Sequence, residues 1–354
     1  NSMKKFFLVG GGTGGHCIPM SVLYSEIIKE NECYILTDER GQKYFKDISV
    51  KKKILIKNLI NKQGKISNLI NFPYIFIQSI HYYLKLRPDF VLGFGGYFTV
   101  PIIIAGWLMR FKIFLHEGNA IIGKANRFLL NFTKDLLTSF ENTLISGKKI
   151  NINNKMVGLP IRINKDDKVL NNNSSNDFVI SVIGGSQGAH NLSINIAESI
   201  KSVQDNSEKR IIVYHQCRSE DLERLQAYYQ THNINNDVRV FFDEMAQVLS
   251  KSNLVISRSG SSTVNEIIYY CIPSILIPYP HASDNHQYYN AKNLNTSECT
   301  KIISNDSVNL ENIINSINEI MNDNERVNLI KNRLKSRRII NPSKNIIDYL
   351  ESHS

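Results

Sequence analysis

The chain lacks several features that mark particular classes of protein. Its 354 residues include five cysteines, and no two of them form a Cys-x-x-Cys pair. This pattern argues against a secreted disulfide scaffold and favours free thiols in a reducing compartment. No run of eighteen apolar residues occurs, so the sequence predicts no membrane-spanning helix. No Asp-x-Asp pair stands out at the end of a predicted strand, so we expect no obligatory metal ion and no other cofactor.

Acidic residues are the scarcer charged type. The chain has 32 Asp and Glu against 42 Lys and Arg, which gives a formal net charge of +10. Such a balance favours an anionic partner, which could be nucleic acid, a phospholipid surface or a phosphorylated substrate. Charge alone does not select among these three.

A chain of this length exceeds the usual limit for one hydrophobic core, so we expect two domains. In the first half, apolar runs that are typical of buried strands alternate with helical periodicity, as in the segment after Pro19. A polar, Asn-rich stretch at 164–177 is typical of a linker, and the alternation then resumes. The expected strands lie at residues 5–9, 33–37, 90–96 and 112–117, then at the start of 178–191 and at 209–216, 238–243, 254–260 and 274–280. The sequence therefore predicts an α/β fold of two similar halves, with a cleft at the carboxyl edges of their sheets.

The first glycine loop follows the opening strand. Five of the six residues from Gly10 to Gly15 are glycine, and His16 comes next. The loop satisfies Gly-x-Gly-x-x-Gly, and Asp38 ends the second strand, so one interpretation is a dinucleotide-binding oxidoreductase. The glycines exceed what a tight turn needs, which favours close approach of backbone amides to an anionic ligand.

Two further loops repeat this design in the second half. Gly184–Gly188 follows a strand, and the sequence SRSGSSTVNEII at 257–268 reads as a strand end, a turn and a helix start. Ser261 or Ser262 is the expected N-cap, the helix start could hold a phosphate, and Glu266 could accept both hydroxyls of a ribose. The segment 280–291 adds polar side chains that could contact a sugar.

Eight ordered motifs together resemble the MurG family of peptidoglycan glycosyltransferases, over nearly the whole chain. They are GGTGGHCIP (11–19), GFGGYFTVP (93–101), HEGN (116–119), VGLPIR (157–162), GGSQGA (184–189), HQ (215–216), RSGSSTVNE (258–266) and PYPHASDNHQYYNA (278–291). The resemblance implies a GT-B fold of two Rossmann-like domains facing across a cleft. It also implies transfer of N-acetylglucosamine from a UDP-sugar to an undecaprenyl-diphosphate-linked muramyl-pentapeptide, with inversion at the sugar.

The resemblance also implies roles for single residues. The predicted donor-binding residues are Thr13, Gly14, Gly15, Asn119, Arg162, Ser186, Phe242 (through its backbone), Ser261, Ser262, Thr263, Val264, Asn265, Glu266 and Gln287. The predicted acceptor side comprises Gly12, Tyr97 and His116 with Glu117. Gly118, Leu159 and Arg218 depart from the residues frequent in the family, which affects fine acceptor contacts and not the reaction.

Single displacement requires a base that takes the proton of the attacking sugar hydroxyl. His16 is the first candidate, because the reference pKa of histidine suits proton transfer near neutrality. His16 could instead only shape the turn. Glu117 and His116 are rival candidates for the base.

The predicted domains are residues 3–163, which would bind the acceptor and the membrane, and 164–339, which would bind the UDP-sugar. A last helix at 340–352 would pack back on the first domain. Lysines at positions 51–65 precede the apolar segment 66–87, which predicts docking on an anionic membrane surface through Leu69, Phe72, Phe76 and Trp107, some of them exposed. We therefore expect a peripheral protein of the cytoplasmic face of the cell membrane. A nucleic-acid-binding module is disfavoured, because the lysines lie beside an aliphatic patch and not among exposed aromatic residues.

Overall fold

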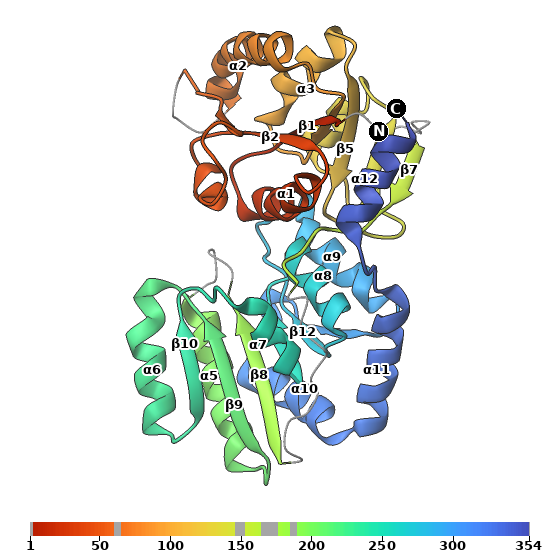
Figure 1. Ribbon diagram of the computed structural model, residues 1–354. Coiled ribbons are helices and arrows are strands. Elements are labelled where there is room, and N and C mark those ends of the chain that lie inside the picture. The colour runs from red at the N-terminus through yellow and green to blue at the C-terminus, as the bar shows by residue number, and fades with distance from the viewer. Residues whose placement is uncertain (1–2, 60–64, 146–152, 164–175, 185–189, 354) are drawn as a thin grey trace. The chain divides into compact units, whose positions relative to one another are not determined.

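The computed structural model describes residues 3–59, 65–145, 153–163, 176–184 and 190–353 (Figure 1). The chain divides into two compact units. Unit 1 comprises Asn1–Ile161 and Ile339–Ser354, and unit 2 comprises Arg162–Arg338. Sequence analysis places the corresponding boundaries at 163/164 and 339/340.

Unit 1 is built on a parallel sheet of seven strands within the described residues, in the order β3-β2-β1-β4-β5-β6-β7. Its strands are β1 (Lys5–Val9), β2 (Glu32–Thr37), β3 (Lys53–Leu55), β4 (Phe90–Gly93), β5 (Lys112–Glu117), β6 (Asp135–Thr138) and β7 (Asn153–Met156). β1 lies between β2 and β4, since Phe6 pairs with Cys33 of β2 and with Phe90 of β4. Its apolar run is buried on both faces of the sheet, as is usual for a strand inside a parallel sheet.

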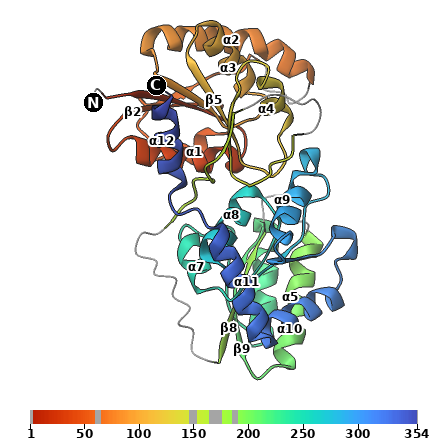
Figure 2. The same ribbon diagram turned by 90° about the vertical axis from the view of Figure 1, so that its right-hand side faces the viewer.

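Helices cover both faces of this sheet. They are α1 (Gly14–Ile27), α2 (Lys65–Leu86), α3 (Thr99–Leu108), α4 (Lys124–Leu129) and the C-terminal α12 (Pro342–Ser352), with the short 3₁₀ helix η1 (Gln42–Phe45). α2 and α3 lie on one face, and α1 and α12 lie on the other (Figure 2). Two separate apolar clusters result, one on each side of the sheet.

Unit 2 repeats this plan with six parallel strands in the order β10-β9-β8-β11-β12-β13. Its strands are β8 (Asp177–Ile183), β9 (Arg210–Gln216), β10 (Asn235–Arg239), β11 (Leu254–Ser257), β12 (Ser274–Leu276) and β13 (Thr300–Ile302). Its helices are α5 (His190–Asp205), α6 (Leu222–Thr231), α7 (Met245–Lys251), α8 (Ser261–Tyr270), α9 (His286–Asn295), α10 (Leu310–Asn322) and α11 (Asn324–Arg337). Short 3₁₀ helices η2 (Ser219–Asp221), η3 (Ser283–Asn285) and η4 (Asn305–Ser307) complete it.

Several elements differ from the sequence prediction, which contains no strand at the positions of β3, β6, β7 and β13. α1 begins at Gly14, before Pro19 and not after it. The helix continues through Pro19, although a proline inside a helix removes one backbone hydrogen bond. β10 ends at Arg239, whereas the apolar pattern predicts a strand over 238–243. Val240 and Phe241 are exposed there, so an apolar run at a sheet edge does not mark buried strand.

The C-terminal helix α12 packs on unit 1, against α1 (Figure 2). Its apolar stripe places Ile346 and Leu350 in the same cluster as the core residues of α1, and both are fully buried. Tyr349 meets Phe114 of β5 edge to face. The last turns of the chain therefore belong to the core of unit 1.

None of the helices in the described part of the chain combines the length and the apolar character that crossing a membrane requires.

Replacing Leu350 with Ala tests the docking of α12. Deleting a fully buried leucine side chain costs about 2–5 kcal/mol, so we expect unit 1 to unfold at clearly lower urea. The single tryptophan, Trp107, lies in unit 1, so its fluorescence reports this transition. Ile340→Ala, at an exposed position of the same segment, is the matched control and should change stability by less than about 0.5 kcal/mol. Equal urea midpoints for the two variants would contradict the packing of α12 in the core of unit 1.

Candidate functional site

In unit 1 the chain order reverses between β1 and β4, and doubly wound sheets bind ligands at the carboxyl ends of the strands at such a reversal. Two glycine-rich loops leave these strand ends. Gly12 has a φ of +80°, and Gly95 and Gly96 have φ values of +97° and +88°. Side chains rarely adopt this conformation, so the loops present bare main chain at these strand ends.

Asp38 holds the first glycine loop together. Its buried Oδ1 accepts hydrogen bonds from the backbone N–H groups of Gly12 and Gly41, both at 2.9 Å. Oδ2 accepts from Arg40 at 3.1 and 3.2 Å. A Cβ on Gly11 would lie 2.7 Å from Asp38 Oδ1. Both carboxylate oxygens are therefore occupied, by Gly12 of the loop and by Gly41 and Arg40 after β2, which argues against the dinucleotide interpretation, where this acid would bind a ribose.

His16 lies in the first turn of α1, half-buried between the two glycine loops. Its Nδ1 is 3.4 Å from the carbonyl oxygen of Gly11. A Cβ added to Gly95 would come within 3.5 Å of Nε2, and one added to Gly96 within 3.5 Å of Cε1. The glycines thus leave room for the half-buried imidazole ring.

His116 and Glu117 end β5, and both are buried. Burial lowers the pKa of His116 to about 4, although its Nε2 hydrogen bond with the carbonyl oxygen of Gly158 at 2.9 Å partly offsets this. His116 is therefore neutral at pH 7. Because the ring is buried and bound to main chain, it is a poorer candidate than His16 for exchanging a proton with a ligand.

Glu117 is engaged by its own loop. Oε1 accepts from the backbone N–H and the Nδ2 of Asn119, at 3.0 and 3.1 Å. Oε2 accepts from the N–H of Gly123 and from Asn126 Nδ2, both at 3.0 Å. Four donors on one carboxylate indicate that Glu117 shapes the loop and holds Asn119 in place, which argues against its predicted role as a base.

Several of the predicted unit 1 residues lie on or next to the two glycine-rich loops. Thr13 is exposed at the N-cap position of α1, without a capping hydrogen bond from its side chain. Gly14 and Gly15 form the first turn of α1, and Tyr97 is 59% exposed beside Gly96. Sequence analysis missed Asn126, which binds both the His116 carbonyl and Glu117. No motif singled it out, because its partners are nine and ten residues away.

In unit 2 the corresponding reversal lies between β8 and β11. Gly184 follows β8, and Arg258, Ser259 and Gly260 connect β11 to α8. The N-cap of α8 is Gly260, with φ −63° and ψ 151°, and the prediction of Ser261 or Ser262 is wrong. Glycine at this position leaves the first amides of the helix uncovered by a capping side chain, which suits an anionic ligand.

The first turns of α8 carry the predicted polar residues. Ser261 and Val264 are buried, and Asn265 Nδ2 donates to the Ser261 carbonyl at 2.8 Å. The buried Ser262 Oγ has no hydrogen-bond partner among the described residues. Thr263 is half-buried in the same turn.

Glu266 is half-buried one turn inside α8. Burial raises its pKa to about 7, and the nearby positive charge of Arg162 counteracts part of this rise. The carboxyl group is therefore poised between its neutral and charged forms near neutral pH. A ligand that donates hydrogen bonds to it would favour the charged form.

Gln287, in the first turn of α9, is held against the start of α8. Its Oε1 accepts from the N–H of Tyr279 at 2.9 Å, and its carbonyl accepts from Ser259 Oγ at 2.7 Å. Asn290 Nδ2 donates to the Ser259 carbonyl at 3.0 Å. The predicted sugar-binding residue and the predicted diphosphate-binding helix thus share one hydrogen-bond network.

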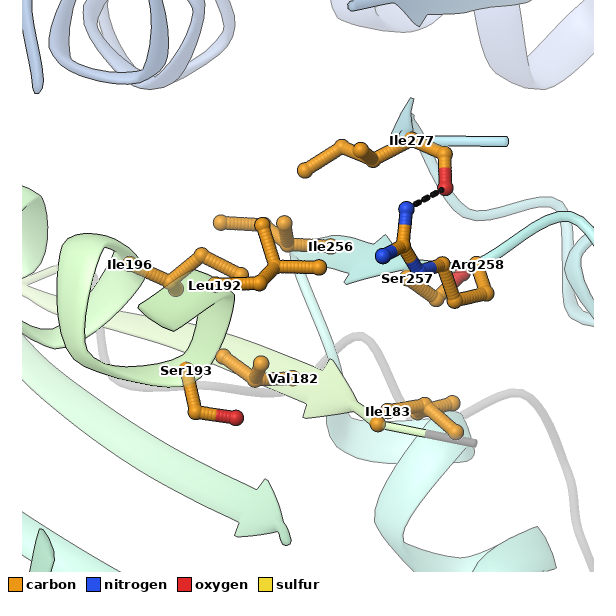
Figure 3. A pocket seen from close by; sticks show the side chains of 10 residues that line it. Val182, Ile183, Leu192, Ser193, Ile196, Ile256, Ser257, Arg258 and Ile277 are labelled. Carbon is orange, nitrogen blue, oxygen red and sulfur yellow. Dashed lines mark hydrogen bonds between the residues drawn. The ribbon is translucent and has the colours of Figure 1, made fainter. Parts of the chain in front are cut away.

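A small cavity lies at the carboxyl ends of β8 and β11 (Figure 3). Apolar side chains from β8 and α5 line one side, among them Val182 and Ile196, and Ser257 and Arg258 line another. Arg258 reaches across to the carbonyl of Ile277. Arg258 belongs to the motif at 258–266, but the sequence predicts no separate role for it.

Phe242 and Ser186 are two further predicted donor residues. The Phe242 side chain is buried under Arg239 and beside Tyr214, so only its main chain could face a ligand. Ser186 lies outside the described residues. Within the described ranges, no three His, Cys, Asp or Glu side chains are grouped to hold a metal ion.

The predicted membrane patch is part exposed and part core. Leu69 is 76% exposed and Trp107 is 44% exposed. Phe72 and Phe76 are half-buried, stack on each other and pack on the core under α2. Further exposed apolar residues of α2 and the end of α3 are Ile70, Tyr74, Ile77 and Leu108.

Comparison with protein families gives matches in both halves of the chain. The glycosyltransferase family 28 N-terminal domain matches residues 6–138, and the glycosyltransferase family 28 C-terminal domain matches residues 179–349. A relative from Rickettsia bellii, named UDP-N-acetylglucosamine--N-acetylmuramyl-(pentapeptide) pyrophosphoryl-undecaprenol N-acetylglucosamine transferase, is 34% identical over 98% of this chain and 100% of its own length. A relative of the same name from Zymomonas mobilis is 33% identical over 86% of this chain and 80% of its own.

Solved structures agree in fold. MurG of Acinetobacter baumannii superposes with a TM-score of 0.77 at 22% identity, over 98% of this chain and 99% of that one. The UDP-GlcNAc 2-epimerase of Neisseria meningitidis gives a TM-score of 0.70 at 16% identity, over 98% and 100%. The predicted GT-B fold, with two Rossmann-like α/β domains, is confirmed.

Proposed function

This chain belongs to glycosyltransferase family 28 and, within it, to the MurG family, and from that membership we propose how its two units divide one reaction. The enzyme transfers N-acetylglucosamine from UDP-N-acetylglucosamine to the undecaprenyl-diphosphate-linked muramyl-pentapeptide, which yields lipid II in peptidoglycan synthesis. Unit 2 holds the donor, and unit 1 holds the acceptor. The observation that carries this division is the uncapped start of α8 with Glu266 and Gln287 beside it.

The donor site follows from the chemistry of α8. Its uncovered amides and the helix dipole attract the diphosphate of UDP, with Ser261 to Asn265 around it. Glu266, one turn further on, accepts the ribose hydroxyls, and Gln287 contacts the transferred sugar. Arg162 adds positive charge on the same side, since it acts on the pKa of Glu266.

The leaving UDP gains negative charge as the sugar departs. We propose that helix-end amides and Arg162 stabilise this charge, with no obligatory metal ion. Fixed dipoles of this kind need no reorganisation during the reaction, which is why they lower the barrier effectively. The acceptor hydroxyl attacks from the opposite face of the sugar, so no covalent intermediate with the enzyme forms.

On the acceptor side, we propose that His16 takes the proton of the attacking hydroxyl. Its ring lies half-buried between Gly11 and the Gly95–Gly96 loop. His116 and Glu117 act as structural supports at the end of β5, because both are buried and bound to the main chain or to loop amides. Thr13 and Tyr97 present exposed groups to the acceptor.

The titration of Glu266 gives a test of donor binding. The pKa of about 7 means that the carboxylate form grows as pH rises from 6 to 8. If only this form accepts the ribose hydroxyls, UDP affinity should rise by up to about tenfold over this range. Isothermal titration calorimetry at several pH values measures the affinity for UDP. In Glu266→Gln this affinity should rise less with pH. The titration of UDP itself affects both proteins equally, so it cancels in the comparison.

The matched control is Glu298→Gln, at an 80% exposed side chain of the same unit, which should keep the wild-type pH profile. A wild-type profile no steeper than that of Glu266→Gln would contradict the ribose role. Absence of UDP binding at millimolar concentration would contradict the proposed function as a whole.

Replacing His16 with Ala tests the base. We expect kcat for transfer to fall about 10²- to 10⁴-fold, as is usual for loss of a general base, while the Kd for UDP stays within about twofold. Glu117→Gln is the comparison: a glutamine presents an NH₂ group to backbone donors, so this variant should lose about 1–3 kcal/mol of stability. Equal losses of turnover and UDP affinity in His16→Ala would indicate a scaffolding role.

We also propose that unit 1 docks on the cytoplasmic face of the cell membrane, where the lipid-linked acceptor lies. The supporting observation is the exposed apolar stripe of α2, with Trp107 and Leu108 at the end of the adjoining α3. Lys57 and Arg110 are exposed on the segments next to these helices and would meet anionic headgroups.

Liposome flotation tests the docking surface. Leu69→Glu combined with Ile77→Glu should weaken binding to vesicles of anionic phospholipid by at least about tenfold, since each change removes an apolar group from the interface and adds a like charge. Leu329→Glu, at a 49% exposed leucine of unit 2, should bind as wild type does. Wild-type binding that ignores lipid charge and salt would contradict the proposal.

A further inference from the structure

Arg258 is a buried cation next to the proposed donor site. It follows β11, is 7% exposed and has no carboxylate partner among the described residues. Its Nε is buried and has no hydrogen-bond partner in the part of the chain that the structure covers. Burying an unpaired guanidinium costs several kcal/mol, so its interactions require an explanation.

The guanidinium binds main-chain oxygens where strands end. Its Nη1 donates to the carbonyl of Ile277 at 3.0 Å (Figure 3). The same Nη1 donates to the carbonyl of Pro278 at 3.2 Å. It also donates to Asn305 Oδ1 at 3.0 Å, and the group lies over the ring of Tyr279 at 5.6 Å. Arg258 therefore fixes the chain just after β12 and ties it to the segment that follows β13.

One of these carbonyls belongs to the peptide unit that orients Gln287. The carbonyl of Pro278 and the N–H of Tyr279 share a single planar group, so holding the oxygen fixes the direction of the N–H. That N–H donates to Gln287 Oε1 at 2.9 Å. Ser259 directly follows Arg258 in the chain, and its hydroxyl donates to the carbonyl of Gln287 at 2.7 Å. Consecutive residues of one turn thus position both the side chain and the main chain of Gln287.

This arrangement also sets which end of the amide meets the ligand. A backbone N–H requires an acceptor, so the oxygen of Gln287 faces Tyr279 and its NH₂ group faces away. An NH₂ group donates, and the hydroxyl oxygens of a sugar accept.

We propose that Arg258 is a positioning residue for sugar recognition. Through the Pro278–Tyr279 peptide it holds the Gln287 amide with its donor end toward the transferred sugar, and it makes no contact with the nucleotide. This inference rests on the proposed function, in which Gln287 contacts that sugar.

The test compares two ligands that differ by the sugar. In the full-length protein, Arg258→Met should bind UDP with a Kd within about twofold of wild type and bind UDP-N-acetylglucosamine about five- to tenfold more weakly. Gln287→Ala should show the same selective loss. The double variant should lose no more than either single variant, because both changes remove one interaction.

Arg338→Met is the matched control, since Arg338 also lies over a tyrosine ring in unit 2, that of Tyr269 at 4.2 Å. It should leave both affinities unchanged. Arg258→Lys covers the case in which the methionine variant fails to fold: one ammonium cannot replace the planar fork, so a smaller loss of the same selective kind is expected.

Equal weakening of UDP and UDP-N-acetylglucosamine would overturn the inference, because it would mean that Arg258 acts on the diphosphate as a charge. Additive losses in the double variant would overturn it too. If the wild-type protein binds neither ligand, it is the proposed function that fails.

Discussion

The arrangement of both sites depends on one constraint, which is that a parallel sheet exposes bare main chain where its strand order reverses. In each unit the strands next to the reversal are buried on both faces, so their ends are the first places where polar groups can reach a ligand. Glycines at 12, 95 and 96 in unit 1 and at 260 in unit 2 keep side chains out of these places. What remains are amides, carbonyls and the start of a helix.

Loops without side chains have little to hold them in shape, and buried charged residues supply this support. Asp38 accepts from the backbone amides of Gly12 in the first loop and of Gly41 after β2, and Glu117 accepts from two backbone amides of the loop that follows β5. Arg258 does the converse in unit 2, where it donates to two carbonyls. In each case the charged group holds main chain in place, next to a residue that we propose contacts a substrate. His16 lies beside the glycine loop that Asp38 binds, and Gln287 is bound by the peptide unit that Arg258 holds.

Much of the fold could be predicted from the sequence, because its signals are local. Apolar runs such as 5–9 and 178–183 mark buried strands, glycine clusters mark the loops after them, and the order of motifs identifies the family. Helix starts were harder to predict. Gly14 begins α1 and Gly260 caps α8, where helix and capping propensities favour other residues.

The supporting network could not be predicted in the same way. Asp38 reads as a ribose-binding acid and Glu117 as a base until their hydrogen bonds are known, because sequence gives the residue type and not its partners. Asn126 and Arg258 bind groups that are distant in sequence or carried by the main chain, so no spacing rule identifies them.

Hydrogen exchange measured with and without UDP tests the central claim, that the nucleotide is held by the start of α8. The proposed donor site predicts slower exchange for the amides of residues 259–264, with little change in residues 10–16. Protection confined to residues 10–16, with α8 unaffected, would contradict it.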